Sequence, residues 1–461
     1  MPELPEVETV KRILTQEVVG KTIAGIEVYR AKNVVTGAEE FVRALKGKTI
    51  EGMSRVGKFL VFELSEGYVI VSHLRMEGKY YAGMKDDPVE KHEILRFLFT
   101  DGTRLSYIDT RKFGVLYLER KEDYLTRAPL TEVGTEPWST DPEGLLRAYR
   151  RKKGPLKEAL LDQGIMCGLG NIYADEVLFA ASLHPLKSCP TLKEEDAEAI
   201  VKESSRILRM AIDNGGSTIR SYHPKEGMDG RMQNVLEAYG RAGKPCSKCG
   251  LPLKKIRVGG RGTTYCPHCQ RDPDHPFVVS LTGPIASGKS AVGVYMAKHG
   301  FTRIDLDQVV SELYQDKEVL AKLQEILGSK AVKDGKLDRP YVLEEIAKDP
   351  SLKEKFEEYV HPLAYEKAIE MEKGHDKVLY EVPFYLGSPI EERTDALIYI
   401  EADTPIRAKR IEERGKNPAL VIKMNENYPW EEVKKKATLT LSGNGTLDEL
   451  HQNLSSVKYL S

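Results

Sequence analysis

Residues 277–300 read FVVSLTGPIASGKSAVGVYMAKHG, and they decide the fold of the second half of the chain. An apolar run leads into the glycine-rich stretch GPIASGKS at 283–290, and a helical pattern follows it. A loop of the form G-x4-G-K-[ST] between a strand and a helix is a phosphate-binding loop. Its backbone amides cradle the phosphates, its lysine reaches the phosphates, and its serine holds magnesium. We therefore expect ATP and Mg²⁺ to contact Gly283, Ala286, Ser287, Gly288, Lys289, Ser290 and Ala291.

The flanking sequence sets the limits of this domain. Downstream, the apolar runs VLYEVPFY (378–385) and ALIYIEAD (396–403) alternate with helical stretches, which is typical of a parallel sheet with crossover helices. Upstream, the polar, proline-bearing stretch RDPDHP at 271–276 reads as a linker. Residues 277–461 are thus predicted to form an α/β P-loop domain.

Four of the six cysteines lie just before that linker, as Cys246, Cys249, Cys266 and Cys269. The pattern C-x2-C-x16-C-x2-C is typical of two knuckles that close a tetrahedral thiolate zinc site. Four protein ligands leave no open position, so this zinc should be structural. The segment 231–270 is therefore predicted to be a zinc-stabilised hairpin.

The N-terminal sequence predicts two further domains. PEVETVKRILTQEVVG (5–20) has the spacing of an amphipathic helix, and alternating apolar and polar runs between glycine turns continue to about residue 130. Residues 1–130 should form an antiparallel β-sandwich with an N-terminal helix, and residues 131–230 a helical domain. Within residues 131–230, a glycine-rich turn precedes a helix that we expect to start near Asn171. The backbone amides at this helix start could hold a phosphate, or the glycines could serve only the packing of the helices.

Composition and charge indicate the cellular location and the possible partners. No apolar run is long enough for a membrane span and no leader pattern is present, so we expect a cytoplasmic monomer that does not contact the membrane. Residues 1–270 carry 42 Lys and Arg against 37 Asp and Glu, a net charge of +5, whereas residues 271–461 carry 27 against 33. Residues 231–270 alone hold eight basic residues and one acidic residue, which suits either a phosphate-backbone contact or a solvated face.

Several segments of residues 1–271 together resemble bacterial formamidopyrimidine-DNA glycosylase: MPELPEVETV, LLDQ, GLGNIYADE, GGSTIRSY, YGRAGKPC and GRGTTYCPHCQ. The resemblance implies a helix–two-turn–helix domain and damaged double-stranded DNA as partner. It also implies that Pro2 attacks the sugar as an N-terminal amine, that Glu3 shuttles protons, and that Lys58, placed on a strand, assists base release. Arg261 would grip phosphate. Without the other motifs, PELPE would read as a terminal turn with solvated acids.

The same resemblance assigns the DNA contacts. Met76, Arg111 and Phe113 correspond to the wedge that fills the space of an extruded base, although Met76 and Phe113 could equally be core residues. This set favours the purine-specific branch over endonuclease VIII. His92, Lys152 and Asn171 match backbone-contact positions, and 221–233 matches a loop that covers the extruded base.

The P-loop half resembles dephospho-coenzyme A kinase through IDLDQVV, DGKLDRPYV and YVHPLAYEKA. This implies Asp305 or Asp307 as the base near a ribose hydroxyl, with Arg339 and His361 near the dephospho-coenzyme A site. Beyond about residue 365 the match weakens, so a divergent or regulatory nucleotide-binding domain stays open. For the N-terminal half the open alternative is a DNA-binding module without catalysis.

Overall fold

The computed structural model describes residues 2–217 and 231–460, without the side chains of 350, 420 and 424–426. These residues form two compact units, one built mainly from residues 2–244 and 252–266 and the other mainly from 267–461. Each unit is described by itself. Among the described residues, no helix has both the length and the apolar character required to cross a membrane.

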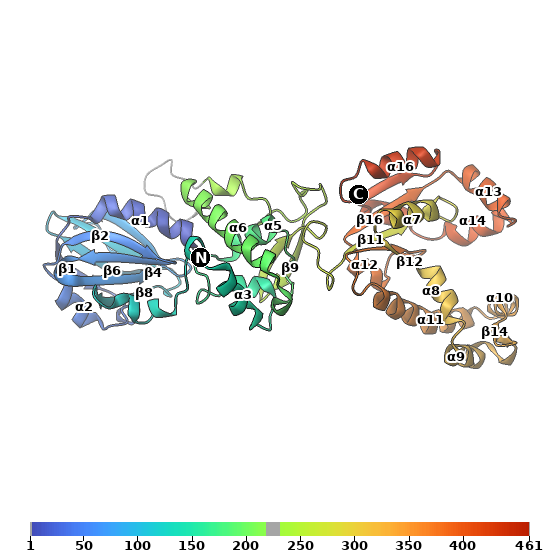
Figure 1. Cartoon of the computed structure of the whole chain (residues 1–461), viewed down its shortest axis with the longest axis horizontal. Coiled ribbons are helices and arrows are strands. Elements are labelled where there is room, and N and C mark those ends of the chain that lie inside the picture. Colours follow the sequence, from blue (N-terminus) through green and yellow to red (C-terminus); the bar gives the residue numbers. More distant parts are fainter. Residues whose placement is uncertain (1, 218–230, 461) are drawn as a thin grey trace. The chain divides into compact units, whose positions relative to one another are not determined.

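The first unit begins with helix α1 (Leu4–Val18) and two four-stranded antiparallel sheets, shown in blue in Figure 1. One sheet has the order β1-β6-β7-β5 and the other β2-β3-β4-β8. The strands are β1 (Ile23–Val28), β2 (Ile50–Val56), β3 (Phe59–Leu64), β4 (Tyr68–His73), β5 (Lys79–Met84), β6 (Glu93–Phe99), β7 (Thr103–Ile108) and β8 (Val115–Arg120). Helix α2 (Ala38–Leu45) lies between β1 and β2 in the chain.

The core of this domain lies between the two sheets. Leu60, Phe62 and Ile70 face Phe97 and Leu105 across it, because alternate residues of a strand point to the same face. The opposite residues of β3 and β4 form a second cluster, covered by Leu130 and the turns around it. The predicted β-sandwich with an N-terminal helix is confirmed.

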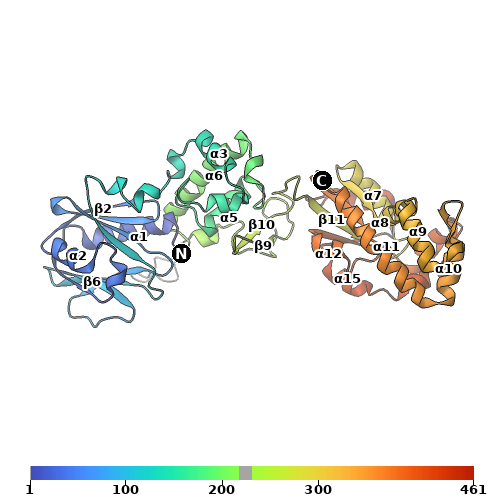
Figure 2. The same cartoon turned by 90° about the horizontal axis from the view of Figure 1, so that it is seen from below.

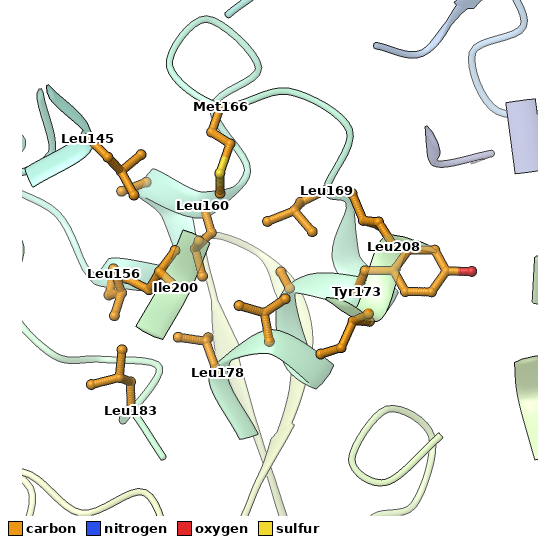
Figure 3. Close-up of a cluster of buried hydrophobic side chains, with 14 of the residues drawn as sticks. Leu145, Leu156, Leu160, Met166, Leu169, Tyr173, Leu178, Leu183, Ile200 and Leu208 are labelled. Carbon is orange, nitrogen blue, oxygen red and sulfur yellow. The ribbon is translucent and has the colours of Figure 1, made fainter. Parts of the chain in front are cut away.

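A helical domain follows, as predicted, and contains α3 (Pro142–Arg150), α4 (Leu156–Leu160), α5 (Asn171–Ala180) and α6 (Glu194–Asp213). Its core is the cluster drawn in Figure 3, to which α4, α5 and α6 contribute Leu160, Leu178 and Leu208. Leu4 from α1 is buried in the same cluster, so the start of the chain is packed into the helical domain. Strands β9 (Lys254–Val258) and β10 (Arg261–Tyr265) then form an antiparallel hairpin.

The second unit is a five-stranded parallel sheet with the order β12-β15-β11-β16-β17 (Figures 1 and 2). Its strands are β11 (Phe277–Thr282), β12 (Thr302–Asp305), β15 (Lys377–Glu381), β16 (Ala396–Glu401) and β17 (Leu439–Ser442). A small hairpin consists of β13 (Val332–Lys333) and β14 (Lys336–Leu337). The predicted parallel P-loop sheet is confirmed.

Helices alternate with the strands of this sheet along the second unit. They are α7 (Lys289–Lys298), α8 (Leu306–Leu313), α9 (Lys317–Leu327), α10 (Arg339–Lys348), α11 (Pro350–Met371), α12 (Pro389–Arg393), α13 (Thr404–Glu413), α14 (Pro418–Glu426), α15 (Trp430–Lys436) and α16 (Leu447–Ser455). Helices α8, α11, α12 and α15 share one buried cluster with the strands. Strand β11 lies in the middle of the sheet. Because all five strands are parallel, the loop that follows β11 lies at the carboxyl edge of the sheet.

Candidate functional site

The turn that precedes α5 joins the two domains of the first unit. The Nζ of Lys58 donates to the carbonyl oxygen of Leu169 at 2.7 Å, and the amide of Gly170 donates to Glu3 Oε2 at 2.6 Å. Lys58 lies in the two-residue turn between β2 and β3, so its predicted position on a strand is wrong. Because the turn lets its side chain reach across to the helical domain, Lys58 is buried despite its charge.

The carboxylate of Glu3 occupies the N-terminus of α5. Besides Gly170, it accepts hydrogen bonds from the amides of Ile172 at 2.9 Å and Tyr173 at 3.3 Å. A Cβ atom on Gly170 would lie 2.4 Å from Glu3 Cδ, so only glycine permits this approach. The phosphate cradle considered for this helix start is therefore wrong for these amides, because Glu3 already uses them and supplies the negative charge that a helix N-terminus favours.

Burial sets the protonation of this pair. Removal from water raises the pKa of Glu3 to about 7, although the charge of Lys58 and the amide hydrogen bonds oppose the rise. Burial likewise lowers the pKa of Lys58, and the charge of Arg261 adds to this effect. Pro2 is half-buried beside Glu3 in the chain. An amine position, a carboxyl group that titrates near neutrality and a lysine thus lie at the junction of the two domains.

Glu6 holds this arrangement together and was not singled out from the sequence. Its carboxylate accepts from the amide of Glu3 at 2.8 Å, the hydroxyl of Tyr173 at 2.7 Å, and the amide and hydroxyl of Ser217 at 2.8 and 2.9 Å. Figure 3 shows the Tyr173 hydroxyl directed away from the leucine cluster. Glu6 lies beside Val7 on the buried face of α1. An acidic residue on an apolar helix face is the sequence feature by which Glu6 could have been found.

The zinc hairpin is attached to α5 through a buried ion pair. Lys157 Nζ lies 2.5 Å from Asp175 Oδ1, and both side chains are 0% exposed. Lys157 also donates to Thr263 Oγ1 at 2.8 Å, and the second oxygen of Asp175 accepts from the amide of Thr264 at 2.9 Å. These bonds fix β10, whose first residue, Arg261, is exposed. Neither member of the pair can be recognised from the sequence, because partners 18 residues apart leave no local pattern.

The four predicted cysteines converge as expected. Their sulfur atoms all lie within 4.8 Å of one another, which suits tetrahedral thiolate coordination of a single zinc ion. A complete set of four ligands leaves no coordination position for a reacting molecule. Zinc at this position would hold the base of the hairpin in place.

Two of the predicted backbone-contact residues, Asn171 and Lys152, belong to the helical domain. Asn171 donates from Nδ2 to the carbonyl oxygen of Gly262 at 3.0 Å, while its Oδ1 is buried and has no partner in the described residues. Lys152 is partly exposed and pairs with Asp162 at 2.5 Å.

The predicted wedge residues are exposed, which excludes the core alternative. Met76 and Phe113 are 41% and 55% exposed. Arg111 connects them, since its Nη1 lies 3.0 Å from Met76 Sδ and its guanidinium lies 5.2 Å from the centre of the Phe113 ring. His92 is half-buried nearby, and its carbonyl accepts the amide of Asp109 at 3.0 Å. The predicted covering loop at 221–233 falls, except for its last three residues, outside the described residues.

The P-loop surrounds a cavity of about 490 Å³ in the second unit. Ala286 and Gly288 have left-handed backbone with φ of 62° and 115°, and Lys289 Nζ donates to the carbonyl oxygens of Gly283 at 2.7 Å and Pro284 at 3.1 Å. Burial lowers the pKa of Lys289 to about 8, against the charges of nearby carboxylates. All seven predicted nucleotide-contact residues belong to this loop and the first turn of α7.

Asp307 lines both this cavity and a second one of about 570 Å³. Burial raises the pKa of Asp307, and the neighbouring Asp305 adds to the rise. Asp305 also lines the P-loop cavity, and its side chain caps α8 by accepting the amides of Asp307 and Gln308. His361 lines the second cavity, whereas Arg339 lines neither and donates to Ser311 Oγ at 3.3 Å. The contact of Arg339 with the acceptor stays a prediction.

Arginines of α13 contact the P-loop itself. Arg410 donates to the carbonyl oxygens of Ala286, Ser287 and Gly443 at 3.2, 3.4 and 2.7 Å. Arg414 lines the first cavity one turn further along. Helix α13 and its C-terminal cap residue thus place cations beside the predicted phosphate position.

Comparison with known families matches four models to the chain, in order. They are the formamidopyrimidine-DNA glycosylase N-terminal domain (1–116), the formamidopyrimidine-DNA glycosylase H2TH domain (133–223), the zinc finger found in FPG and IleRS (243–271) and dephospho-CoA kinase (277–449). Formamidopyrimidine-DNA glycosylases of Bacillus anthracis and Shouchella clausii are both 47% identical, over 274 and 277 residues. The matches cover 59% of this chain and 99% and 100% of these relatives.

Solved structures agree with this result. Lactococcus lactis Fpg, in complexes with DNA containing Fapy-dG or an abasic site, is 42% identical with a TM-score of 0.55, covering 59% of this chain and 100% of its own. A two-sheet domain, a helical domain and a zinc hairpin with a proline–glutamate start define the helix–two-turn–helix class of DNA repair proteins. Through residues 1–271 the chain belongs to the formamidopyrimidine-DNA glycosylase family, and residues 277–449 match the dephospho-CoA kinase family model.

Proposed function

We propose that the first unit is a bifunctional DNA glycosylase and AP lyase that excises oxidised purines, namely formamidopyrimidines and 8-oxoguanine, from duplex DNA. The observation that carries this proposal is the buried Glu3 carboxyl group, whose pKa of about 7 suits proton transfer at neutral pH, beside Pro2 and Lys58. Family membership supports the substrate class.

In the proposed reaction the Pro2 nitrogen, free once Met1 is removed, bonds to the sugar C1′ while the glycosidic C–N bond breaks. The base leaves with the bonding electrons and takes up a proton, in which Lys58 assists. Protonated Glu3 donates to the sugar ring oxygen, so the ring opens to an iminium. Loss of the C2′ proton then expels the 3′-phosphate, a second elimination expels the 5′-phosphate, and water releases the enzyme.

The proposed DNA contacts rest on the resemblance to the family. Met76, Arg111 and Phe113 are the proposed wedge, and Arg261, held by the zinc hairpin, is the proposed phosphate contact during elimination. His92, Lys152 and Asn171 are proposed contacts to the DNA backbone. Unstacking a base costs a few kcal/mol, which inserted side chains offset.

Strand scission tests this function. The full chain, expressed so that Met1 is removed, should nick duplex DNA containing 8-oxoguanine and leave phosphate at both ends of the gap. Glu3→Gln should abolish nicking of this substrate, whereas Glu17→Gln, an exposed position on the same helix, should retain it. Nicking by Glu3→Gln at the wild-type rate would contradict the assigned role of Glu3.

For the second unit we infer an ATP-dependent kinase acting on dephospho-coenzyme A. Its support is Asp307, which lies where the P-loop cavity and the second cavity meet and can take the proton of an acceptor hydroxyl. Lys289 and Ser290 would hold the phosphates and Mg²⁺, with Asp305 positioning α8. Mg²⁺, when bound there, would lessen the negative charge of the phosphates.

The test is formation of coenzyme A from ATP and dephospho-coenzyme A by the full chain. Lys289→Ala should abolish product formation and Lys298→Ala, exposed at the other end of α7, should not. ATP binding without coenzyme A formation would contradict the kinase proposal and favour a regulatory nucleotide-binding domain.

A further inference from the structure

The wedge residues stand on two separate turns of the β-sandwich. Met76 belongs to the segment between β4 and β5, and Arg111 and Phe113 belong to the segment between β7 and β8. Exposed turns ordinarily sample many conformations, and ordering them on binding costs free energy. Three buried residues, Asp109, Asn33 and Tyr107, contact these turns.

The buried side chain of Asp109 holds the turn between β7 and β8 in place. Its side chain is fully buried, and it accepts the amide of Arg111 at Oδ1 (2.9 Å) and the amide of Gly114 at Oδ2 (2.7 Å). Its own carbonyl oxygen accepts the amide of Lys112 at 3.2 Å. One residue therefore binds both ends of the segment that carries Arg111 and Phe113.

Asn33 supports the same turn from a different part of the chain. It is 3% exposed and comes from the short turn between β1 and α2. Its Nδ2 donates to the carbonyl oxygen of Gly114 at 2.5 Å and to that of Lys112 at 3.2 Å. Lys112 has a left-handed φ of 60°, so these bonds stabilise a backbone conformation that is unfavourable for lysine.

Tyr107 sets the spacing between the two turns. Its hydroxyl is buried and has no hydrogen-bond partner among the described residues. A Cβ atom would lie 2.2 Å from this oxygen at Gly78 and 1.6 Å from it at Gly114. The backbones of both turns therefore rest against one ring, and glycine is required at each contact.

We propose that Asp109, Asn33 and Tyr107 are positioning residues that assemble the wedge before DNA binds. This inference rests on the proposed function. Because the turns are already ordered, insertion does not have to fix them, and the free energy of binding remains available to unstack the damaged base. The three residues act through Met76, Arg111 and Phe113 and touch no reacting atom.

The test compares two DNA duplexes that differ in whether a base must be extruded. One carries 8-oxoguanine and the other an abasic site, and single-turnover nicking by the full chain is measured on both. Asn33→Ala removes two hydrogen bonds and should slow nicking at 8-oxoguanine by about 10- to 100-fold, since each bond contributes roughly 1 kcal/mol. Nicking at the abasic site should change by less than about threefold, because no base is unstacked.

Asp109→Asn should show the same selectivity, because an amide nitrogen cannot accept one of the two backbone N–H groups. Asp101→Asn is the matched control, since Asp101 accepts Thr103 in an exposed turn of the same sheet and should affect neither substrate. A 2-aminopurine next to the lesion reports wedge insertion by its fluorescence, and Asn33→Ala should delay that signal.

Equal slowing on both duplexes, or no slowing on either, would overturn the inference while leaving the proposed function intact. Failure of the wild-type chain to nick either duplex would overturn both. If Asp109→Asn does not fold, Asn33→Ala decides the question, because it leaves the Asp109 bonds in place.

Discussion

Replacing Asp175 by asparagine should loosen the zinc hairpin from α5. The substitution keeps the size of the side chain but removes the negative charge beside Lys157. The Lys157 ammonium would then stay buried without a counter-charge, or lose its proton, and both outcomes weaken its bonds to the hairpin at Thr263 and Gly262. Arg261 would consequently lose its fixed position.

The structure supplies both the magnitude and a control. Removing one partner of a buried ion pair costs about 3–5 kcal/mol. Lys152 and Asp162 form a pair with the same 2.5 Å separation, but their side chains are 44% and 34% exposed. Since exposed pairs contribute about 0–1 kcal/mol, Asp162→Asn should have little effect.

Hydrogen exchange of the peptide spanning residues 254–265 in the full chain measures the difference. Asp175→Asn should accelerate exchange in this peptide by about 100- to 1,000-fold or more, and Asp162→Asn by less than about tenfold. DNA affinity should fall in parallel for Asp175→Asn alone. Equal protection of the hairpin in the two variants would refute the view that the buried pair attaches it.

Three further outcomes follow from the site. Because the pKa of Glu3 is raised to about 7, its proton-donating form predominates below that pH, so single-turnover excision should decline as pH rises from 7 to 9; a rate that climbs over this range would exclude Glu3 as the proton donor. Gly170→Ala should displace the Glu3 carboxylate and reduce excision at least about tenfold, whereas Gly25→Ala, which has open space around it, should not; equal activity of the two variants would show that the close contact is dispensable. Cys249→Ser should release zinc, detected by a chelating dye, and weaken DNA binding, whereas Ser247→Ala in the same knuckle should retain both, and undiminished DNA affinity without zinc would mean that the hairpin is stable alone.

Features encoded within one short segment could be predicted from the sequence. The strand, loop and helix at 277–300 follow one another without interruption, and glycine at 283 and 288 permits the backbone that the loop needs. The zinc cysteines likewise come as two closely spaced pairs whose ligand type is specific. Local pattern and chemistry coincide in these segments.

Features that depend on long-range contacts could not be predicted in this way. Glu3 is bound by amides about 170 residues away, and the resulting pKa depends on burial that no local pattern reveals. The family resemblance implies a strand position for Lys58, whereas the structure has it in the two-residue turn between β2 and β3, which the apolar runs on both sides do not reveal. Lys157 is followed by Glu158 and has the pattern of an ordinary surface charge, so only the structure shows that it is buried and paired with Asp175.

Borohydride trapping on duplex DNA containing 8-oxoguanine shows directly whether Pro2 is the nucleophile. Reduction converts an iminium between the enzyme and the sugar into a stable amine, and digestion followed by mass spectrometry locates the attachment. We expect one cross-link per chain, on the peptide that begins with Pro2, and its loss in Pro2→Gly. A cross-link mapped to Lys58, or one of undiminished yield in Pro2→Gly, would contradict this expectation.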